Sequence, residues 1–323
     1  HTEDGKKDFV RELTRKCFVN GIRIKNVQHL SKKNGRNAIV FQARTVGRSC
    51  VAAKKVVPVL TEVLRSGYYP DDSNRRIINE EYHQYIFIQE DRFKLLSGVA
   101  RMNKGKSHFN GDNFLISRLE CGKAIAAIAD GMGSGKRAYI ESRMVIELME
   151  NCIDAGFDEK ASIDLINSAY IAGGGTGNPV TMDMSVIDCQ SGYMHCMKLG
   201  AVSTFIRRDK WVEIIQSTTL PMGVLEQVDY DCTTKKLYDG DYIVMVSDGV
   251  LDNIPCVNKE ERMAQMIHAL TIREPSAMAE KLLEQSLAYN DMKASDDCTV
   301  LVLGLFDTCL LYTSPSPRDR TRS

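Results

Sequence analysis

The order of predicted helices and strands after about residue 92 is the feature that most limits the folds open to this chain. Helices are predicted at about 137–154, 158–171, 259–271 and 275–289, and the strands around them include FLISRLE, AIAAIAD, TMDMSVID, DYIVMVSDG and CTVLVLGLF. The helices come in pairs and the strands in groups. That grouping is typical of antiparallel sheets covered by helices, whereas a Rossmann or P-loop fold alternates strand and helix. We therefore predict an α+β fold for this part of the chain.

A smaller block precedes this region. Its expected elements are an amphipathic helix over 8–20, two strands, GIRIKNVQHL and NAIVFQART, joined by the turn KKNG, a helix in VVPVLTEVLRSG and a strand in YHQYIFIQE. We predict a small α/β module over 1–90 and a larger domain over 91–307. Residues 308–323 have no periodicity, so we expect a non-native or disordered tail there.

Composition excludes several classes of protein. Forty-two basic and forty-two acidic residues cancel, which gives no support for nucleic-acid binding. The ten cysteines are scattered with no C-x-x-C pair, so a zinc site is not expected, and reduced, mostly buried thiols indicate the cytoplasm. No apolar run approaches the roughly eighteen residues that cross a bilayer. Because the chain begins at His1, we expect a fragment, with a possible membrane segment upstream.

Aspartates fall at the ends of several apolar strands. Asp112 in GDN precedes a strand, Asp130 ends AIAAIAD, and Asp248 ends YIVMVSD. Asp296 and Asp297 in SDDCT begin the last strand. Each carboxylate should therefore lie at the rim of a core, where acidic groups repel one another unless a cation lies between them. Mg²⁺ and Mn²⁺ prefer such oxygen ligands, and two ions together activate water for attack on a phosphoryl group.

Two simpler interpretations compete with this one. An Asp-Gly pair at a strand end is a common turn, and only the topology decides whether the aspartates meet. GSGK also looks like a phosphate-binding P-loop, which requires G-x-x-x-x-G-K-[ST]. Asp130 stands where the first glycine belongs, and Arg137 stands where serine or threonine belongs. The P-loop interpretation fails at both positions.

The motifs GDN, ADGMGSG, LPMG, LYDGDYIVMVSDGVLD and DDCTVLVL, in this order, resemble the metal-dependent PPM (PP2C-like) serine/threonine phosphatases. ADGMGSGKRA followed by ES is most similar to the phosphatase domain of the stage II sporulation protein E branch of that family. The resemblance covers about 92–307 and implies an α-β-β-α sandwich of antiparallel sheets flanked by helices. Residues 1–90 resemble part of the regulatory region before that domain.

The resemblance also assigns roles to residues of the site. It implies two Mn²⁺ or Mg²⁺ ions, with Asp130 bridging both and the Gly131 carbonyl assisting. Asp248 and Asp296 would be the remaining core ligands, so Asp130, Asp248 and Asp296 are the predicted catalytic set. The implied reaction is hydrolysis of phosphoserine or phosphothreonine by a metal-bridging water, without a phosphoenzyme.

Other positions have weaker assignments. Asp112 resembles an outer carboxylate that holds metal-bound water, and Asp297 is ranked below Asp296 as a metal ligand. For the phosphate, the stretch before GDN offers only Lys104, Lys106 and His108, which we expect to be solvated loop residues rather than phosphate ligands.

A control function is expected in the turn after Asp130. Gly131, Gly133 and Gly135 could absorb a backbone change, and the two helices that follow are a switch in the resembled family. The alternative is a tight turn that needs positive φ.

The resemblance further implies a partner, a phosphorylated anti-anti-sigma-like protein, in control of a sigma factor during sporulation. A homodimer through the regulatory region and tethering to a membrane by a missing N-terminal segment, with this part on the cytoplasmic side, are additional expectations. The alternative function is a non-catalytic or weakly catalytic phosphoprotein-binding module of the same fold.

Four further features have structural interpretations. GGGTGNP, at 173–179, is expected to be a flexible connection, and Asp183 a structural polar contact on a strand. His195 is expected to be a satisfied sheet histidine. Asp252 either supports Asp248 or caps a turn.

Overall fold

The computed structural model describes residues 3–31, 37–105, 108–119, 122–133, 135–172, 178–200, 203–209, 211–225 and 229–308. The chain divides into two compact units, one made mainly of residues 1–92 and one mainly of residues 93–307. Four expectations fall outside the described part: the KKNG turn, Lys106, most of GGGTGNP, and the tail after residue 308.

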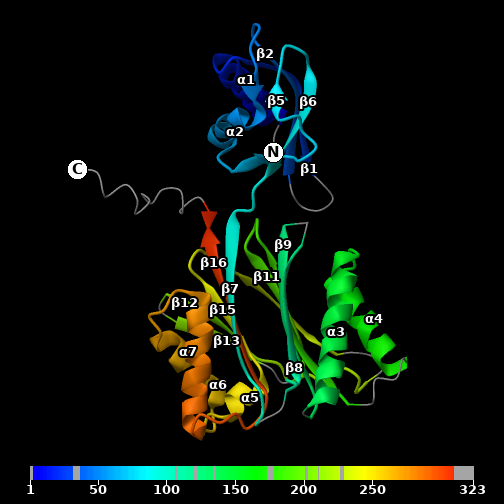
Figure 1. Cartoon of the computed structure of the whole chain (residues 1–323), viewed down its shortest axis with the longest axis vertical. Helices are drawn as coiled ribbons and strands as arrows, with labels where there is room; N and C mark the ends of the chain where they lie inside the picture. Colours follow the sequence, from blue (N-terminus) through cyan, green and yellow to red (C-terminus); the bar gives the residue numbers. More distant parts are fainter. Residues whose placement is uncertain are drawn as a thin grey trace, which may run out of the picture. The chain divides into compact units, whose positions relative to one another are not determined.

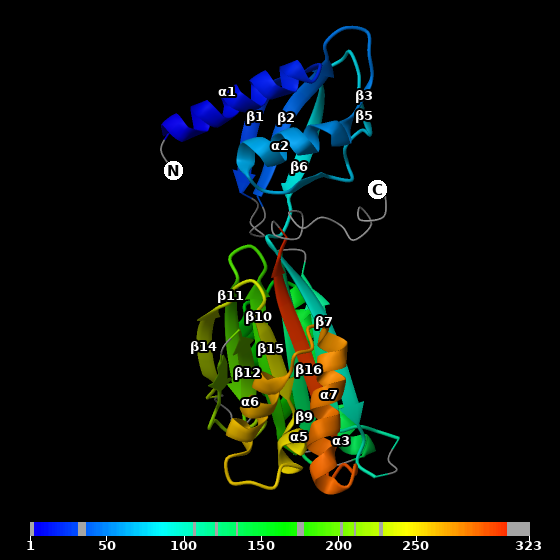
Figure 2. The same cartoon turned by 90° about the vertical axis from the view of Figure 1, so that its left-hand side faces the viewer.

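The first unit is a four-stranded antiparallel sheet with two helices on one face (Figures 1 and 2). The strand order is β1-β2-β6-β4, with bounds Ile22–Ser31, Asn37–Thr45, His83–Gln89 and Tyr68–Pro70. The remaining elements are α1 (Glu3–Val19), β3 (Val51–Ala52), a 3₁₀ turn (Ala53–Val56), α2 (Val57–Leu64) and β5 (Ile77–Ile78). Leu13 of α1 and Leu60 of α2 share one core with Phe41 and Phe87, whose rings stack at 5.4 Å between centroids. This core gives the unit its own hydrophobic centre.

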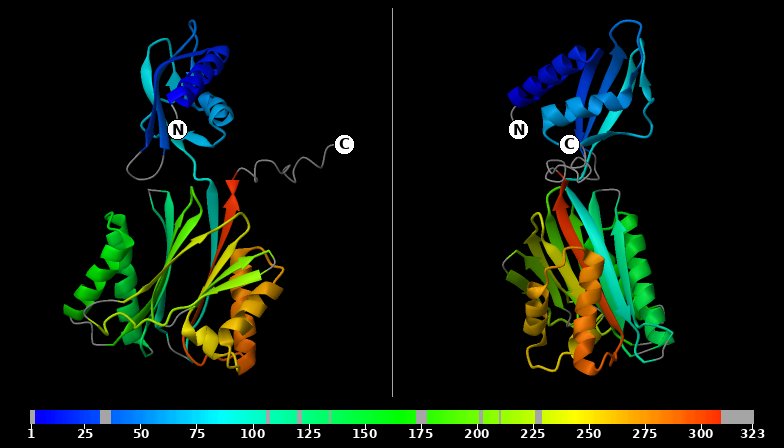
Figure 3. Two further views of the ribbon diagram at one scale, coloured as in Figure 1. Left: turned by 180° about the vertical axis from the view of Figure 1, so that it is seen from behind. Right: turned by 60° about the vertical axis from the view of Figure 1, so that its left-hand side comes forward.

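The second unit contains two five-stranded antiparallel sheets stacked face to face (Figures 1 and 3). The first sheet has the order β14-β11-β10-β9-β8, with bounds Asp231–Lys236, Tyr193–Leu199, Val180–Asp188, Lys123–Gly131 and Asp112–Arg118. The second has the order β13-β12-β15-β16-β7, with bounds Trp211–Ile215, Ser203–Arg208, Tyr242–Val246, Cys298–Asp307 and Phe93–Met102.

Helices cover the outer face of each sheet. α3 (Lys136–Asp154) lies against β8 and β9 and packs on α4 (Glu159–Ala172). On the other side, α7 (Pro275–Leu287) lies against β7 and β16, and α6 (Lys259–Ala269) lies against β12 and β13. The short α5 (Asp248–Asp252) and a 3₁₀ turn (Ala288–Asn290) complete this unit. The predicted α-β-β-α sandwich is confirmed.

The apolar strands of the sequence form the centres of the two sheets. Ala126 and Ile128 of β9 pack between the sheets against Met245 of β15 and Leu301 of β16. Val244 and Val246 of β15 point the other way, into the core under α6 and α7. Because β15 has apolar partners on both faces, its sequence is apolar throughout rather than alternating.

Most of the cysteines among the described residues are buried. Within the same residues no helix has the length and hydropathy needed to cross a membrane.

In both Asp-Gly pairs at strand ends, the backbone of another segment passes so close to the glycine that a side chain would not fit. A Cβ on Gly249 would lie 2.1 Å from the carbonyl oxygen of Asp297. A Cβ on Gly131 would lie 2.4 Å from the carbonyl oxygen of Ala138, in the first turn of α3. Neither glycine has a positive φ, so space rather than backbone freedom excludes a side chain there.

We expect Gly249→Ala to lower the free energy of unfolding by about 3 kcal/mol or more, because backbone atoms of Asp297 cannot move aside as a side chain does. The matched control is Gly240→Ala, where φ is +81° but nothing lies within 4 Å of the added Cβ. That variant should lose only about 1 kcal/mol. Urea denaturation of both variants decides; equal losses would contradict the steric explanation.

Candidate active site

Two aspartates of the first sheet lie directly opposite each other. Asp112 begins β8 and is paired in register with Asp130 near the end of β9. Opposite residues of an antiparallel pair project from the same face, so the two carboxyl groups are neighbours. Asp112 is fully buried and Asp130 is partly buried.

The second sheet brings a further group of aspartates to its own strand ends. Asp248 follows β15 and begins α5, while Asp296 and Asp297 precede β16. Strands β15 and β16 are paired, and their ends are joined by reciprocal bonds between Ser247 and Thr299 of 3.0 and 2.9 Å. The adjacency of these strands places Asp248 beside the Asp296–Asp297 pair.

Asp297 connects the two groups. Its carboxylate oxygens accept hydrogen bonds of 2.7 Å from the backbone N–H groups of Lys104 and Gly111. A Cβ on Gly111 would lie 3.2 Å from Asp297 Oδ2 and 3.6 Å from Asp130 Oδ1. The loop that delivers Asp112 is thus held by an aspartate of the opposite sheet. In this structure Asp297 acts as a support for the GDN loop.

The pKa values of these groups reflect their crowding. Burial raises the pKa of Asp130 to about 9, and the charges of neighbouring aspartates add to the increase. These neighbours are Asp112, Asp248 and Asp296. The structure therefore brings together the three predicted catalytic aspartates and the predicted outer carboxylate.

Burial likewise raises the pKa of Asp112 to about 7, although the nearby hydroxyls of Thr299 and Ser247 oppose part of the increase. Asp248 lies at the solvent-exposed edge of the group, yet the protein packed around it still raises its pKa, helped by the charge of Asp252. Without a cation, Asp112 and Asp130 therefore keep protons at pH values where isolated aspartates have released them.

The donor set suits a hard divalent cation. Both carboxylate oxygens of Asp112 are buried without a hydrogen-bond partner of ordinary geometry among the described residues. A buried oxygen of this kind is costly unless a proton or a cation satisfies it. In the described ranges, no three histidine, cysteine, aspartate or glutamate side chains are arranged to hold an ion as they stand. The residues nevertheless fit Mg²⁺ or Mn²⁺ by their chemistry, because these ions prefer oxygen ligands.

Helix α3 is hydrogen-bonded directly to the GDN loop. The hydroxyl of Ser142 donates to the carbonyl of Gly111 and accepts a 2.8 Å bond from the side-chain amide of Asn113. Asn113 also donates to the carbonyl of Tyr139 at 3.2 Å. In the sequence Ser142 belongs to the ES motif, and no local pattern predicts its role in holding this loop.

The glycines between Asp130 and α3 divide into two kinds. Gly133 and Gly135 have φ of +104° and +83° with open space around them, as the tight-turn alternative requires. Gly131 has ordinary φ and is small because α3 passes over it. The switch remains a hypothesis for Gly133 and Gly135.

Arg101 is a basic residue near the site that no sequence motif indicated. It lies on β7, where its guanidinium donates to the carbonyl of Asp112 and stands 5.5 Å from the centre of the Phe114 ring. Nothing in GVARM marks it, because only the pairing of β7 with β16 brings it to this end of the sheet. Of the basic candidates that were predicted, Lys104 reaches Asp296 at 3.4 Å across an exposed pair, and His108 is exposed.

The remaining candidates take structural positions. Asp183 is buried and bonded to Lys198, which agrees with a structural polar contact. His195 is exposed on β11 and lies 3.3 Å from the hydroxyl of Thr234. Asp252 accepts a 2.7 Å bond from Lys259 and influences Asp248 only through its charge.

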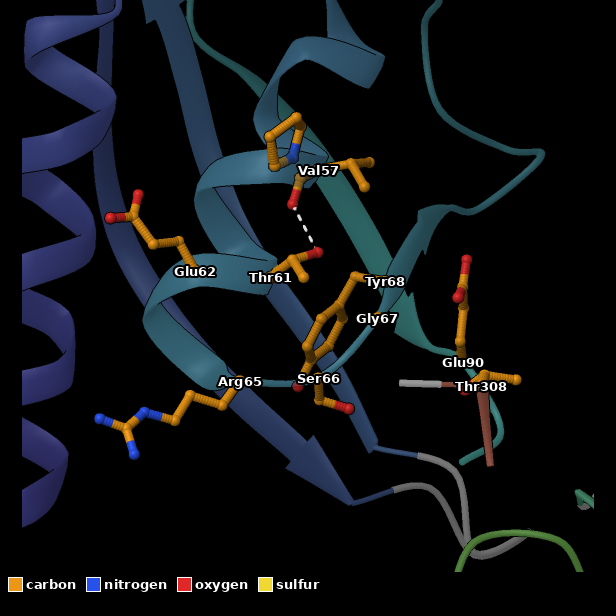
Figure 4. A pocket seen from close by; sticks show the side chains of 10 residues that line it. Val57, Thr61, Glu62, Arg65, Ser66, Gly67, Tyr68, Glu90 and Thr308 are labelled. Atoms are coloured by element: carbon orange, nitrogen blue, oxygen red, sulfur yellow. Dashed lines mark hydrogen bonds between the residues drawn. The ribbon is translucent and has the colours of Figure 1, made fainter. Parts of the chain in front are cut away.

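A cavity of about 650 Å³ lies elsewhere, in the first unit (Figure 4). Its lining is Val57, Pro58, Thr61, Glu62, Arg65, Ser66, Gly67, Tyr68, Glu90 and Thr308. Figure 4 shows Glu90 and Thr308 on one side of Tyr68, with Glu62 and Arg65 on the other. Thr61 donates to the Val57 carbonyl at 3.0 Å. The side chains that line this cavity do not form a catalytic set. We therefore place the chemistry at Asp112, Asp130, Asp248 and Asp296, which we call the acidic cluster.

The chain is similar in sequence to proteins of one known family. A family model described as Stage II sporulation protein E (SpoIIE) matches residues 121–306. The chain is 29% identical over 284 residues to Stage II sporulation protein E of Bacillus subtilis (strain 168). It is 30% identical over 253 residues to the protein of the same name from Priestia megaterium. These alignments cover 88% and 78% of this chain but only 34% and 43% of the two relatives.

Solved structures show the same similarity. The PP2C phosphatase domain of SpoIIE from Bacillus subtilis with a fragment of its regulatory domain superposes with a TM-score of 0.71 at 27% identity. That match covers 94% of this chain and 93% of the other. RsbX in complex with magnesium shares the fold, with a TM-score of 0.52 at 20% identity over 65% of this chain and 95% of the other. The resemblance to PP2C-like phosphatases is confirmed.

The raised pKa values predict how the metal-free protein responds to pH. The pKa of an aspartate in the unfolded chain is near 3.8. A carboxyl group whose pKa is higher in the folded protein makes its full contribution to stability below pH 3.8. This contribution is lost as pH rises through the folded values of about 7 and 9. In EDTA we therefore expect the temperature of the thermal unfolding midpoint to decrease as the pH is raised from 6 to 9.

Asp130→Asn, which removes one of these charges, should flatten that fall, and added Mn²⁺ should oppose it in the unaltered protein. The measurement is differential scanning fluorimetry across the pH series. A midpoint that rises or stays constant over this range would show that the carboxyl groups are not crowded in solution.

Proposed function

Because the chain belongs to the stage II sporulation protein E family of PP2C-type phosphatases, we propose that it is a metal-dependent protein phosphatase that hydrolyses a phosphoserine on a small regulatory protein. The observation that supports this most is the meeting of Asp112, Asp130, Asp248 and Asp296 at the ends of strands from two sheets. Gathering these carboxyl groups in a partly buried place opposes folding, and a cation offsets that cost. A phosphoprotein-binding module without catalysis has no need of such a group.

Within this proposal each residue has a task. Asp130 and the Gly131 carbonyl, with Asp248 and Asp296, would hold the metal ions, and Asp112 would lie at the outer edge of the site. When bound, divalent ions supply an activated water and positive charge for the phosphoryl oxygens. The exposed edge at Asp248 leaves the phosphoserine a path of entry from solvent.

Hydrogen bonds within the protein hold the loop that carries Asp112. Asp297 fixes the loop before Asp112 through two backbone bonds, and Ser142 ties the same loop to α3. Arg101 holds the Asp112 carbonyl and brings a positive charge close to the carboxylates, where it would also attract a phosphate group. These contacts hold Asp112 in place before any ion binds.

We propose the substrate from the family to which the chain belongs. It is a phosphorylated anti-anti-sigma-like protein that acts in sporulation. The chain spans 34% of the Bacillus subtilis relative and 43% of the Priestia megaterium relative, so homodimerisation through the regulatory region and membrane attachment are proposals for the whole protein.

The test is phosphate release from a phosphoserine protein in Mn²⁺. We expect EDTA and Asp130→Asn each to lower turnover about 100-fold or more, because EDTA removes the metal ions and Asp130→Asn removes one of their proposed ligands. Asp209→Asn is the matched control, since Asp209 is exposed in the turn between β12 and β13 and faces no part of the site. Turnover that survives both chelator and Asp130→Asn would refute the proposal.

A further inference from the structure

A buried ion pair interrupts the apolar core between the two sheets. Lys198 Nζ lies 2.6 Å from Asp183 Oδ2, and both side chains are about 1–2% exposed. The two residues are direct cross-strand partners on β11 and β10. Thr204, on β12 of the opposite sheet, accepts a 2.7 Å bond from Lys198 Nζ and donates to Asp183 Oδ2. We call Asp183, Lys198 and Thr204 the buried triad.

The stability of the core does not explain the buried triad. The surrounding core is apolar and includes Ala126, Ile128, Met194, Cys196, Ile206, Met245 and Leu301. Replacing a buried ion pair by apolar side chains of similar volume is often neutral or stabilising, because both charges lose their hydration on burial. In addition, Asp183 Oδ1 has no hydrogen-bond partner among the residues that the structure describes. An arrangement that is this costly calls for a role other than packing.

The location of the buried triad indicates that role. Asp183 is the cross-strand partner of Ile128, two residues before Asp130 on the same face of β9. On the other sheet, Thr204 is the partner of Met245, three residues before Asp248. The triad therefore lies one layer of side chains below the cluster of Asp112, Asp130, Asp248 and Asp296, and its hydrogen bonds join the sheet of Asp130 to the sheet of Asp248.

We propose that the buried triad positions the acidic cluster, by fixing the distance and register between the two sheets that carry its carboxylates. This role rests on the proposed metal-dependent function, because it matters only if ligands from both sheets must converge on the same ions. Apolar side chains pack without strong directional preference, whereas charge-assisted hydrogen bonds fix the direction of their partners. Ligand sets need positions held within about 0.5 Å. The buried triad supplies this constraint immediately beneath the site.

The first test removes only the connection between the sheets. Thr204→Val deletes the hydroxyl and leaves the Asp183–Lys198 pair within its own sheet. We expect calorimetric Mn²⁺ affinity to fall about tenfold, as for other residues that support metal ligands. The thermal midpoint should drop by about 4–8 °C, because the Thr204 hydroxyl makes two hydrogen bonds. Thr204→Ser keeps the hydroxyl and should restore the affinity.

A second variant, Lys198→Met with Asp183→Asn, removes both charges together, so that no unpaired charge stays buried. The matched control is Arg208→Met with Asp241→Asn, which breaks a pair whose Arg208 Nε–Asp241 Oδ2 distance is 3.3 Å. Arg208 is the last residue of β12, whereas Thr204 is near its start. We expect the triad variant to weaken Mn²⁺ binding about tenfold or more and the control to leave it unchanged.

The outcomes separate this role from the proposed function. If the unaltered protein binds Mn²⁺ and hydrolyses phosphoserine but Thr204→Val binds Mn²⁺ equally well, the positioning role is wrong and the function stands. An equal loss in the Arg208–Asp241 control would also overturn it, since general destabilisation would then suffice. If the unaltered protein binds no Mn²⁺, the proposed function fails and this role fails with it. Should the doubly substituted protein not fold, Thr204→Val decides alone.

Discussion

Mutual repulsion among aspartates crowded at the strand ends is the constraint on which the rest of the second unit depends. Asp112 and Asp130 face each other across β8 and β9, and the charges of Asp248 and Asp296 reach them from the opposite sheet. Folding alone does not favour such an arrangement, since each group loses hydration and gains a like-charged neighbour. It persists because two large apolar sheets, each held by its own helices, fix the strands whose ends carry these groups.

Short-range contacts then hold the loops around the cluster. Gly131 and Gly249 admit the backbone of α3 and of Asp297 at distances that leave no room for a side chain. Asp297 binds the loop before Asp112, and Ser142 ties that loop to α3. A shift of α3 would therefore reach Asp112 through Ser142 and reach Asp130 through Gly131. This is a physical basis for the switch hypothesis, because the helix and the ligand loops share hydrogen bonds and van der Waals contacts.

Much of this organisation follows from local patterns in the sequence. Apolar runs that end in Asp-Gly located Asp130 and Asp248, and the pairing of helices argued against the alternating strands and helices of a P-loop fold. The local sequence does not distinguish a functional aspartate from an ordinary turn residue, because the difference depends on which strands become neighbours. Arg101 and Ser142 carry no local signal for the same reason: each reaches Asp112 or its loop only through pairing or packing between distant segments.

The sequence by itself determined which side chains the strand ends carry, where the chain turns, and that the sheets are antiparallel with helices packed on them. Those properties depend on side-chain period and turn chemistry within a few residues. The tertiary structure alone decided that Asp112 lies opposite Asp130, that Asp297 supports a loop of the other sheet, and that Lys198 is buried beside Thr204. Each of these contacts joins residues from different strands or loops, so it exists only once strand order and sheet stacking bring them together.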